Sequence, residues 1–318
     1  MAAEDKKKVS FFRMLGTAFI IYLVVSIISG LLITGQTIGM GFGNVALIEI
    51  RGVLTTQGAP QTLFSSPVIS SDEYARLIDE AANRRSVDAI VISIDSPGGT
   101  AVASYEIVQA IKRASEKKPV ITYIREVGAS GAYWAASASD HIIIQELAVT
   151  GSVGVIASYL EFSGLFEKYG IQYVRVTGGE YKDLGSPFRN ATEEESRLLQ
   201  AKIDEIHNIF YDDVEASRGL HERTEEELRM IRSGIIFTAR EALSHGLVDE
   251  IGSFERVEEV LKEEYGLERV QYSRMIRAGG SMGLFGMRIE DALAYIGFGM
   301  GRAMHDRISP DSHITITT

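Results

Sequence analysis

The stretch AIVISIDSPGGT, from Ala89 to Thr100, decides the fold class. Residues 89–94 form an almost unbroken apolar run rich in β-branched side chains, which is typical of a strand buried on both faces of a sheet. Asp95 to Gly99 then forms a turn, and a helix is expected from about Val102 to Ser115. A strand that passes directly into a helix predicts a parallel βαβ unit.

The same alternation continues on both sides of this stretch. Further strands are expected at residues 46–50, 119–124, 141–144, 153–156 and 172–176. Further helices are expected at residues 72–82, from the turn at 128–131, and at 160–169, 192–218, 225–231, 239–244 and 254–264. The helix at 192–218 begins with the capping-box pattern TxxE, formed by Thr192 and Glu195. Strands that alternate with helices predict an α/β fold.

The N-terminal region contains a long uncharged stretch. Residues 14–34 are predominantly apolar, and at 1.5 Å per residue this segment would span roughly 31 Å, which matches the core of a bilayer. A buried core helix and a cleaved signal peptide are the alternatives, although the apolar core of a signal peptide is only ~7–15 residues long. Lys6, Lys7, Lys8 and Arg13 precede the stretch. The positive-inside rule therefore predicts a cytoplasmic N-terminus and an extracytoplasmic remainder.

These features predict five parts of the chain. They are a cytoplasmic N-terminus at 1–13, a transmembrane anchor at 14–34, a Gly-rich linker at 35–44, an α/β domain at 45–272 and a Gly- and Met-rich tail at 273–318. Arg288, Glu290 and Asp291 argue against a second span within the tail. An amphipathic surface helix and a mobile tail are both compatible with its composition.

Composition excludes several classes of function. With 32 Lys and Arg against 43 Asp and Glu, the formal net charge is −11, which argues against non-specific nucleic-acid binding. The absence of cysteine excludes disulfides, Cys-ligated zinc, iron–sulfur clusters and a cysteine nucleophile. The six histidines show no HExxH-type spacing, so neither a metal nor a cofactor is expected.

Two small-residue turns are candidate sites, because ligands of open α/β sheets bind where strands end and helices begin. In the turn at residues 96–100, Gly98 and Gly99 leave backbone N–H groups exposed to an anionic oxygen. An ordinary tight turn is the alternative. In the turn at residues 128–133, Ser130 can project its hydroxyl, and the N–H of Gly131 can face a developing oxyanion. The alternative is that Ser130 merely caps the following helix.

A serine nucleophile needs a base, because its hydroxyl is a weak nucleophile at neutral pH. No histidine lies near a comparable turn. Lys182 lies in the irregular stretch GGEYKDLGSPF at residues 178–188, and a lysine can act as a base where burial keeps its amine uncharged. The neighbouring carboxylates of Glu180 and Asp183 would oppose this if they faced the amine. The alternative is an ordinary surface lysine.

Taken together, these motifs resemble the signal peptide peptidase A-type proteases of peptidase family S49. The matching segments are IVISIDSPGGTAVAS (90–104), GASGAYWAAS (128–137), TGSVGVI (150–156), GGEYKDLGSPFR (178–189) and FTAREALSHGLVDEIG (237–252). They occur in the family's order, and the resemblance covers residues 45–272. An N-terminal membrane anchor is also typical of this family.

The resemblance implies a Ser–Lys dyad, with Ser130 as nucleophile and Lys182 as general base. It further implies an oxyanion hole formed by Gly99 and Gly131, and a hydroxyl of Ser152 that orients the lysine amine. The implied fold is the crotonase-like or Clp-protease-like spiral of ββα units. Family members form homo-oligomers, need no cofactor, and degrade remnant signal peptides and other membrane-associated or unfolded polypeptides.

Two features lie outside the resemblance. Ala132 replaces the more usual glycine after Ser-Gly, and it should be tolerated unless its φ is positive. The tail at 273–318 has no counterpart in the matched motifs. Two other functions remain open at this point: a crotonase-fold lyase or hydratase acting on acyl-CoA, which also uses two backbone amides as an oxyanion hole, and a non-catalytic membrane scaffold.

Overall fold

The computed structural model describes residues 43–58 and 68–275. The predicted anchor at 14–34 lies outside these residues, as do most of the linker and nearly all of the tail. Among the residues that are described, no helix has the length and apolar character needed to cross a membrane.

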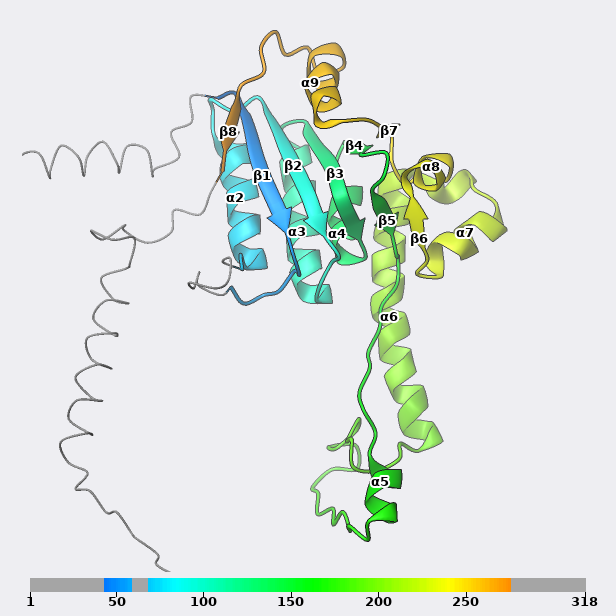
Figure 1. Ribbon diagram of the computed structural model, residues 1–318. Helices are drawn as coiled ribbons and strands as arrows, with labels where there is room; N and C mark the ends of the chain where they lie inside the picture. Colours follow the sequence, from blue (N-terminus) through cyan, green and yellow to red (C-terminus); the bar gives the residue numbers. More distant parts are fainter. Residues whose placement is uncertain (1–42, 59–67, 276–318) are drawn as a thin grey trace, which may run out of the picture. The chain divides into compact units, whose positions relative to one another are not determined.

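A single sheet organises the described residues (Figure 1). Its strands are β1 (Val45–Arg51), β2 (Ala89–Ser96), β3 (Val120–Ala129), β4 (His141–Ile144), β5 (Val149–Gly151), β6 (Ile236–Thr238), β7 (Glu250–Ile251) and β8 (Tyr272–Arg274). The order is β6-β5-β3-β2-β1-β8, and β4 lies between β3 and β7. Only β5 and β6 pair in antiparallel fashion among the described strands. The predicted α/β class is therefore confirmed.

Helices cover both faces of the sheet. The helices of the described residues are α2 (Ser71–Asn83), α3 (Ala101–Ser115), α4 (Gly131–Ser137), α5 (Ser163–Lys168), α6 (Glu193–Arg218), α7 (Glu225–Arg232), α8 (Ala239–Ser244) and α9 (Phe254–Glu263), with a short 3₁₀ turn, η1, at Leu220–Glu222. Strand β2 shows why the run at 89–94 is apolar throughout. Ile90 and Ile92 pack into the larger core with α2, α3 and α4, whereas Val91 packs into the smaller core against α9. Each such side chain contributes about 1.5–3 kcal/mol when fully buried.

Several predicted elements differ from the observed ones. The strand predicted at 153–156 is wrong: β5 is Val149–Gly151, and it ends because Gly151 and Ser152 have positive φ values of 81° and 54°. The segment 172–176 forms no strand, because nothing pairs with it. The helix predicted at 160–169 is limited to α5.

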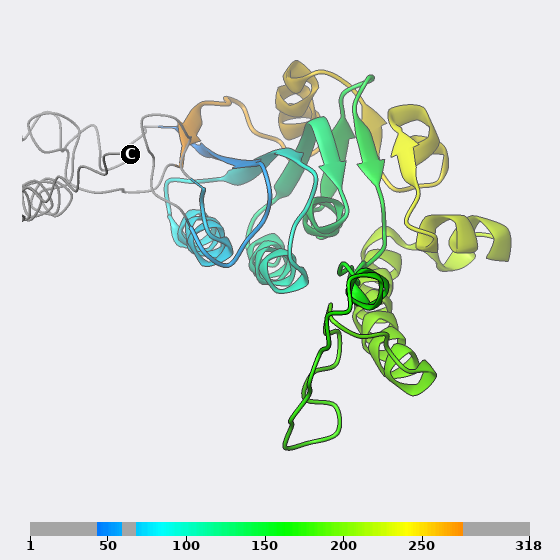
Figure 2. The same ribbon diagram turned by 60° about the horizontal axis from the view of Figure 1, so that its bottom comes forward.

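Residues 156–192, here called the arm, extend away from the sheet beside the N-terminal half of α6 (Figures 1 and 2). No residue of α5 is buried, and Phe166 and Phe188 stack at 5.6 Å between ring centroids. Many apolar side chains of the arm are exposed, including Ile156, Leu160, Tyr169, Val174 and Val176. In the adjoining helix, none of the residues 196–209 is buried. The arm and this part of α6 therefore present apolar surface that the described chain leaves uncovered.

Candidate active site

Ser130 lies in a strained turn between β3 and α4. Its φ of 54° and ψ of −128° are unusual for a residue with a side chain, and such a conformation costs about 1–3 kcal/mol. Its amide donates a hydrogen bond of 2.8 Å to the carbonyl of Gly151. Although Ser130 occupies the N-cap position of α4, its hydroxyl makes no capping bond. The capping role considered above is therefore wrong, and the half-buried hydroxyl is free to react.

Hydrogen bonds hold the loop after β2 in place. Some lie within the loop, and others join it to the segment that follows β1. The Ser96 hydroxyl donates to the Gly52 carbonyl at 2.6 Å and accepts from the Gly98 amide at 3.1 Å. The Leu54 amide donates to Gly98 at 2.8 Å, and the Leu54 carbonyl accepts from the Thr100 amide at 2.9 Å. These bonds use the groups on either side of Gly99 and hold its amide in place.

Three glycines allow this loop to approach the Ser130 turn. A Cβ atom on Gly98 would lie 2.8 Å from the Gly131 nitrogen and 3.0 Å from Ser130 Cβ, and one on Gly99 would lie 1.9 Å from the Leu54 carbonyl oxygen. A Cβ on Gly131 would lie 1.9 Å from Ser104 Oγ and 3.5 Å from the Gly99 nitrogen. A side chain at Gly98 would therefore clash with the Ser130 turn, one at Gly99 with the Leu54 backbone, and one at Gly131 with Ser104.

The amides of Gly99 and Gly131 consequently lie close to each other and to Ser130. Neither amide donates a hydrogen bond to any acceptor in residues 43–58 or 68–275. Two neighbouring N–H groups without acceptors among the described residues, beside a serine hydroxyl, are groups that could stabilise an oxyanion in acyl transfer. Ala132, which replaces the usual glycine, is fully buried and is not among the described residues of positive φ, so its backbone does not need the conformation that favours glycine.

Ser152 lies next to this turn, because Ala129 and Gly151 are paired at the ends of β3 and β5. Its φ of 54° is positive, and its amide donates to the Ile235 carbonyl at 2.7 Å. Within the described part of the chain, Ser130 and Ser152 are the only non-glycine residues of positive φ. Both serines identified from the sequence thus occupy strained positions directly after the carboxyl ends of the paired strands β3 and β5.

Lys182 is the one predicted site residue that the structure does not bring close to Ser130. It lies in a turn of the arm, its side chain is exposed, and its amine makes no hydrogen bond or ion pair within the described residues. The arm leads away from the end of β3 (Figures 1 and 2). Four of the five predicted residues, Ser130, Gly99, Gly131 and Ser152, therefore lie together, and Lys182 lies apart from them in this single chain.

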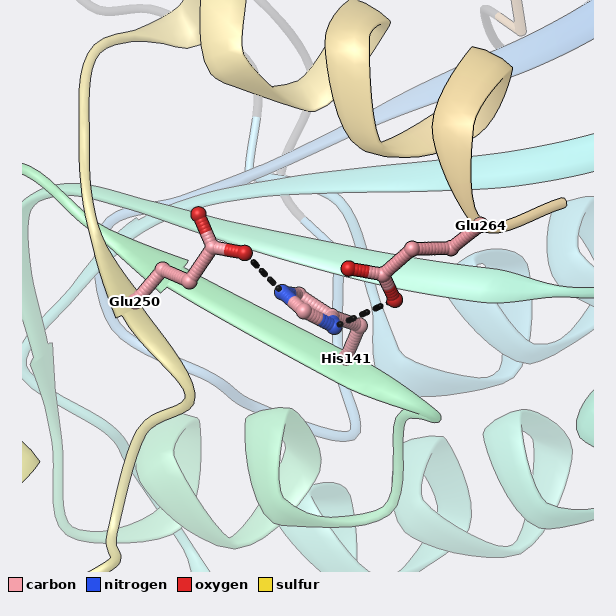
Figure 3. Close-up of side chains that lie close together, drawn as sticks. All are labelled: His141, Glu250 and Glu264. Atoms are coloured by element: carbon pink, nitrogen blue, oxygen red, sulfur yellow. Dashed lines mark ion pairs between the residues drawn. The ribbon is translucent and has the colours of Figure 1, made fainter.

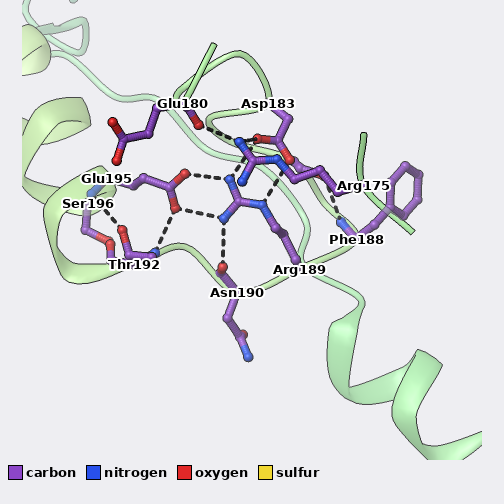
Figure 4. Close-up of polar contacts among 10 residues, drawn as sticks. Arg175, Glu180, Asp183, Phe188, Arg189, Asn190, Thr192, Glu195 and Ser196 are labelled. Atoms are coloured by element: carbon purple, nitrogen blue, oxygen red, sulfur yellow. Dashed lines mark hydrogen bonds and ion pairs between the residues drawn. The ribbon is translucent and has the colours of Figure 1, made fainter. Parts of the chain in front are cut away.

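The turn that carries Lys182 is held by ion pairs that the sequence analysis did not identify (Figure 4). Arg189 contacts Asp183 at 3.0 Å and Glu195 at 2.5 Å, and Arg175 contacts Asp183 at 2.8 Å. The hydrogen bonds from Arg189 lower the pKa of Asp183 and lower that of Glu195 to about 2. The capping-box motif at the start of α6 identified Glu195 from the sequence. It did not identify the two arginines, because they lie in segments without regular secondary structure.

One cluster within the described residues could hold a metal ion (Figure 3). His141 lies between two carboxylates: Nε2 faces Glu250 and Nδ1 faces Glu264, each at 3.5 Å. Arg256 contacts both oxygens of Glu250, at 2.6 and 3.2 Å. Because the two carboxylates face different ring nitrogens and Arg256 already pairs with one of them, the cluster is poorly arranged to hold one metal ion.

Comparisons with known proteins agree with these motifs. The model of "Peptidase family S49" matches residues 112–268. A Methanocaldococcus jannaschii protein described as a "Putative protease" is 33% identical over 233 residues, which cover 73% of this chain and 71% of the relative. The Enterococcus faecium "Putative signal peptide peptidase SppA" is 30% identical, with 73% and 67% covered. For the Arabidopsis thaliana "Serine protease SPPA, chloroplastic" the identity is also 30%, with 72% and 34% covered.

Among solved structures, a mutant of the "1510-N membrane-bound stomatin-specific protease" matches with a TM-score of 0.43 and 18% identity. The match covers 74% of this chain and 94% of that one.

Proposed function

The chain belongs to the S49 family of signal peptide peptidase A-type serine proteases, and we propose that it cleaves peptides with a dyad of Ser130 and Lys182. The observation that carries this proposal is the free hydroxyl of Ser130 beside two unpaired amides. An acyl-CoA lyase would have no use for a strained serine at this position. Membership in a peptidase family also argues against that alternative.

The proposed mechanism follows from the positions of these groups. Uncharged Lys182 accepts the Ser130 proton as Oγ attacks the scissile carbonyl. The amides of Gly99 and Gly131 bind the resulting oxyanion, at about 3 kcal/mol per donor. Lys182 then gives the proton to the leaving amine, and water hydrolyses the acyl-enzyme. Ser152 would orient the amine by accepting a hydrogen bond from it.

Because Lys182 lies on the exposed arm, the dyad is proposed to form between two copies of the chain. The support is the uncovered apolar surface of the arm, with Val176 93% exposed and Ile156 91% exposed. Leu198 and Ile209 on α6 are also exposed. In a ring of subunits, each arm could cover the Ser130 turn of the neighbouring subunit. This contact would bury the apolar surface of the arm and remove water from the Lys182 amine.

The substrates and location are proposed from the family and from the N-terminal sequence. An anchor at 14–34 would place the protease domain outside the cytoplasm, next to the membrane. Remnant signal peptides and other membrane-associated or unfolded polypeptides would then be the substrates, and the family's ββα spiral would be the fold. No cofactor is needed for the proposed chemistry.

Activity of purified full-length protein on a fluorogenic peptide tests this function. Ser130→Ala and Lys182→Ala should each abolish hydrolysis, and only chains that retain Ser130 should be labelled by a fluorophosphonate. A wild-type protein that neither cleaves peptides nor reacts with the probe would support the alternative of a non-catalytic scaffold. Hydrolysis that survives in either variant would refute the dyad.

A further inference from the structure

Both residues that flank Lys182 are tied by their side chains to the start of α6, whereas the Lys182 amine has no hydrogen-bond or ion-pair partner among the described residues. The Tyr181 hydroxyl donates to Glu194 at 2.9 Å. On the other side, Asp183 accepts two hydrogen bonds of 3.0 Å from Arg189, one to each carboxylate oxygen. The segment around them has no regular secondary structure apart from turns. Side-chain contacts, rather than a backbone ladder, therefore fix the position of the turn.

Arg189 is the link between this turn and the helix. The same guanidinium that holds Asp183 also donates to both oxygens of Glu195, at 2.8 and 2.5 Å. Glu195 in turn accepts from the Thr192 amide at 2.8 Å within the capping box of α6. The Glu195 side chain is only 5% exposed, and that of Asp183 only 15%. The network thus joins the arm to the first turn of α6 through side chains that are largely withdrawn from solvent (Figure 4).

The network also neutralises the carboxylate of Asp183, the residue that follows Lys182 in the chain. An unpaired carboxylate at Asp183 would favour the charged form of a neighbouring lysine, which cannot act as a base. Here two guanidinium groups engage that carboxylate, since Arg175 contacts it at 2.8 Å in addition to Arg189. Arg175 also donates to the Glu180 carbonyl. The groups that face the Lys182 turn are thus two arginines and the carboxylates of Glu180, Asp183, Glu194 and Glu195.

From this geometry we propose that Arg189 is a positioning residue for the base: it fixes the Lys182 turn on the first turn of α6 and neutralises the Asp183 carboxylate beside it. The inference rests on the proposed function of Lys182 and extends it to a residue that touches no reacting atom. A lysine at 189 could not replace it, because only a planar guanidinium can bind two carboxylates in this bidentate manner.

The test compares Arg189→Ala and Arg189→Lys with Arg197→Ala in the full-length protein. Arg197 is a nearby control on α6 whose one hydrogen bond within the described residues goes to the Glu193 carbonyl. We expect Arg189→Ala to lower kcat roughly 10- to 100-fold, because the base is misplaced, with KM changed less than about twofold. The ascending limb of its pH–rate profile should move to higher pH. Methylguanidinium chloride should restore part of kcat, and Arg197→Ala should behave as wild type.

Three outcomes would overturn the inference. The first is an unchanged kcat and pH profile in Arg189→Ala, in a protein that Lys182→Ala still inactivates. The second is a loss of kcat accompanied by a lower melting temperature or by loss of the oligomer, which would assign Arg189 a structural role. The third is a fully active Arg189→Lys. Failure of the proposed function itself would be distinguishable, since either the wild type would be inactive or Lys182→Ala would retain activity, whatever Arg189 does.

Discussion

The amide of Ser130 donates a 2.8 Å hydrogen bond to the carbonyl of Gly151, and this bond links one strained serine, Ser130, to the residue that precedes the other, Ser152. Directly after the paired residues Ala129 and Gly151, both chains adopt a positive φ. Ser130 and Ser152 are therefore turned out of the sheet side by side. The strain is maintained because the sheet pairing and the buried helix α4 hold the backbone on either side.

Substituting Gly131 tests the close approach of the two turns. Its added Cβ would meet Ser104 Oγ at 1.9 Å, so Gly131→Ala should lower the free energy of unfolding by about 1–3 kcal/mol and also lower kcat by displacing an oxyanion donor. Gly164→Ala is the matched control, because nothing lies within 4 Å of its Cβ. Urea denaturation and peptide hydrolysis would measure both effects. Equal stability and activity for the two variants would contradict the geometry.

Two substitutions of Ser152 distinguish the role of its hydroxyl from the effect of its backbone strain. Ser152→Gly relieves the positive φ of 54° and should be more stable than Ser152→Ala by about 1 kcal/mol. Both variants lack the hydroxyl proposed to orient Lys182, so both should lose kcat to a similar degree. Thermal unfolding and kinetics of the two variants provide the comparison. Wild-type kcat in either variant would remove Ser152 from the mechanism.

Acid should loosen the arm before it unfolds the sheet. Hydrogen bonds from Arg189 lower the pKa of Glu195 to about 2 and lower that of Asp183 as well. Since these pKa values are below those of the unfolded chain, the carboxylates stabilise the arm above about pH 4.3, and this contribution is lost as the pH falls toward 2.

An NMR titration of the Glu195 carboxyl and limited pepsin digestion between these pH values would follow this change. Cleavage should begin within residues 175–192, and Arg189→Ala should make it begin at higher pH. A Glu195 carboxyl that titrates in the ordinary range for glutamate would disprove the proposed ion pairing.

Peptide hydrolysis should accelerate toward alkaline pH, because a lysine acts as a base only when uncharged. We expect kcat/KM to rise between about pH 6 and pH 9, measured at constant ionic strength with a substrate that does not titrate in this range. A flat profile would speak against an amine as the base.

The sequence predicted the central sheet well, because its strands are encoded locally. The β-branched run at 89–94 and the capping box at Thr192 and Glu195 reappear as β2 and the start of α6. Strand β5 was misplaced because its end depends on positive φ at Gly151 and Ser152, which apolar patterning does not reveal. The short strands β6, β7 and β8 were missed because each is defined by its partner strand and not by its own two or three residues.

The candidate site could be predicted only in part for the same reason. Ser130, Gly99 and Gly131 belong to local strand-to-helix turns, whose geometry the sequence largely specifies. The location of Lys182 depends on an arm without regular structure, and its support by Arg189 depends on contacts between irregular segments. The proposed contact between the arm and a second copy of the chain has no sequence motif of its own. Its one trace is the set of apolar residues that the described chain leaves exposed.

The most direct measurement mixes two inactive proteins. Ser130→Ala retains the lysine and Lys182→Ala retains the serine, so co-assembled subunits should form some complete sites if the dyad joins two copies. An equal mixture, unfolded and refolded together, should recover about a quarter of wild-type activity, the statistical share of sites with both residues in a ring of head-to-tail contacts. A mixture that stays inactive, although mass spectrometry shows mixed oligomers, would contradict the proposed joining of Ser130 and Lys182 between subunits.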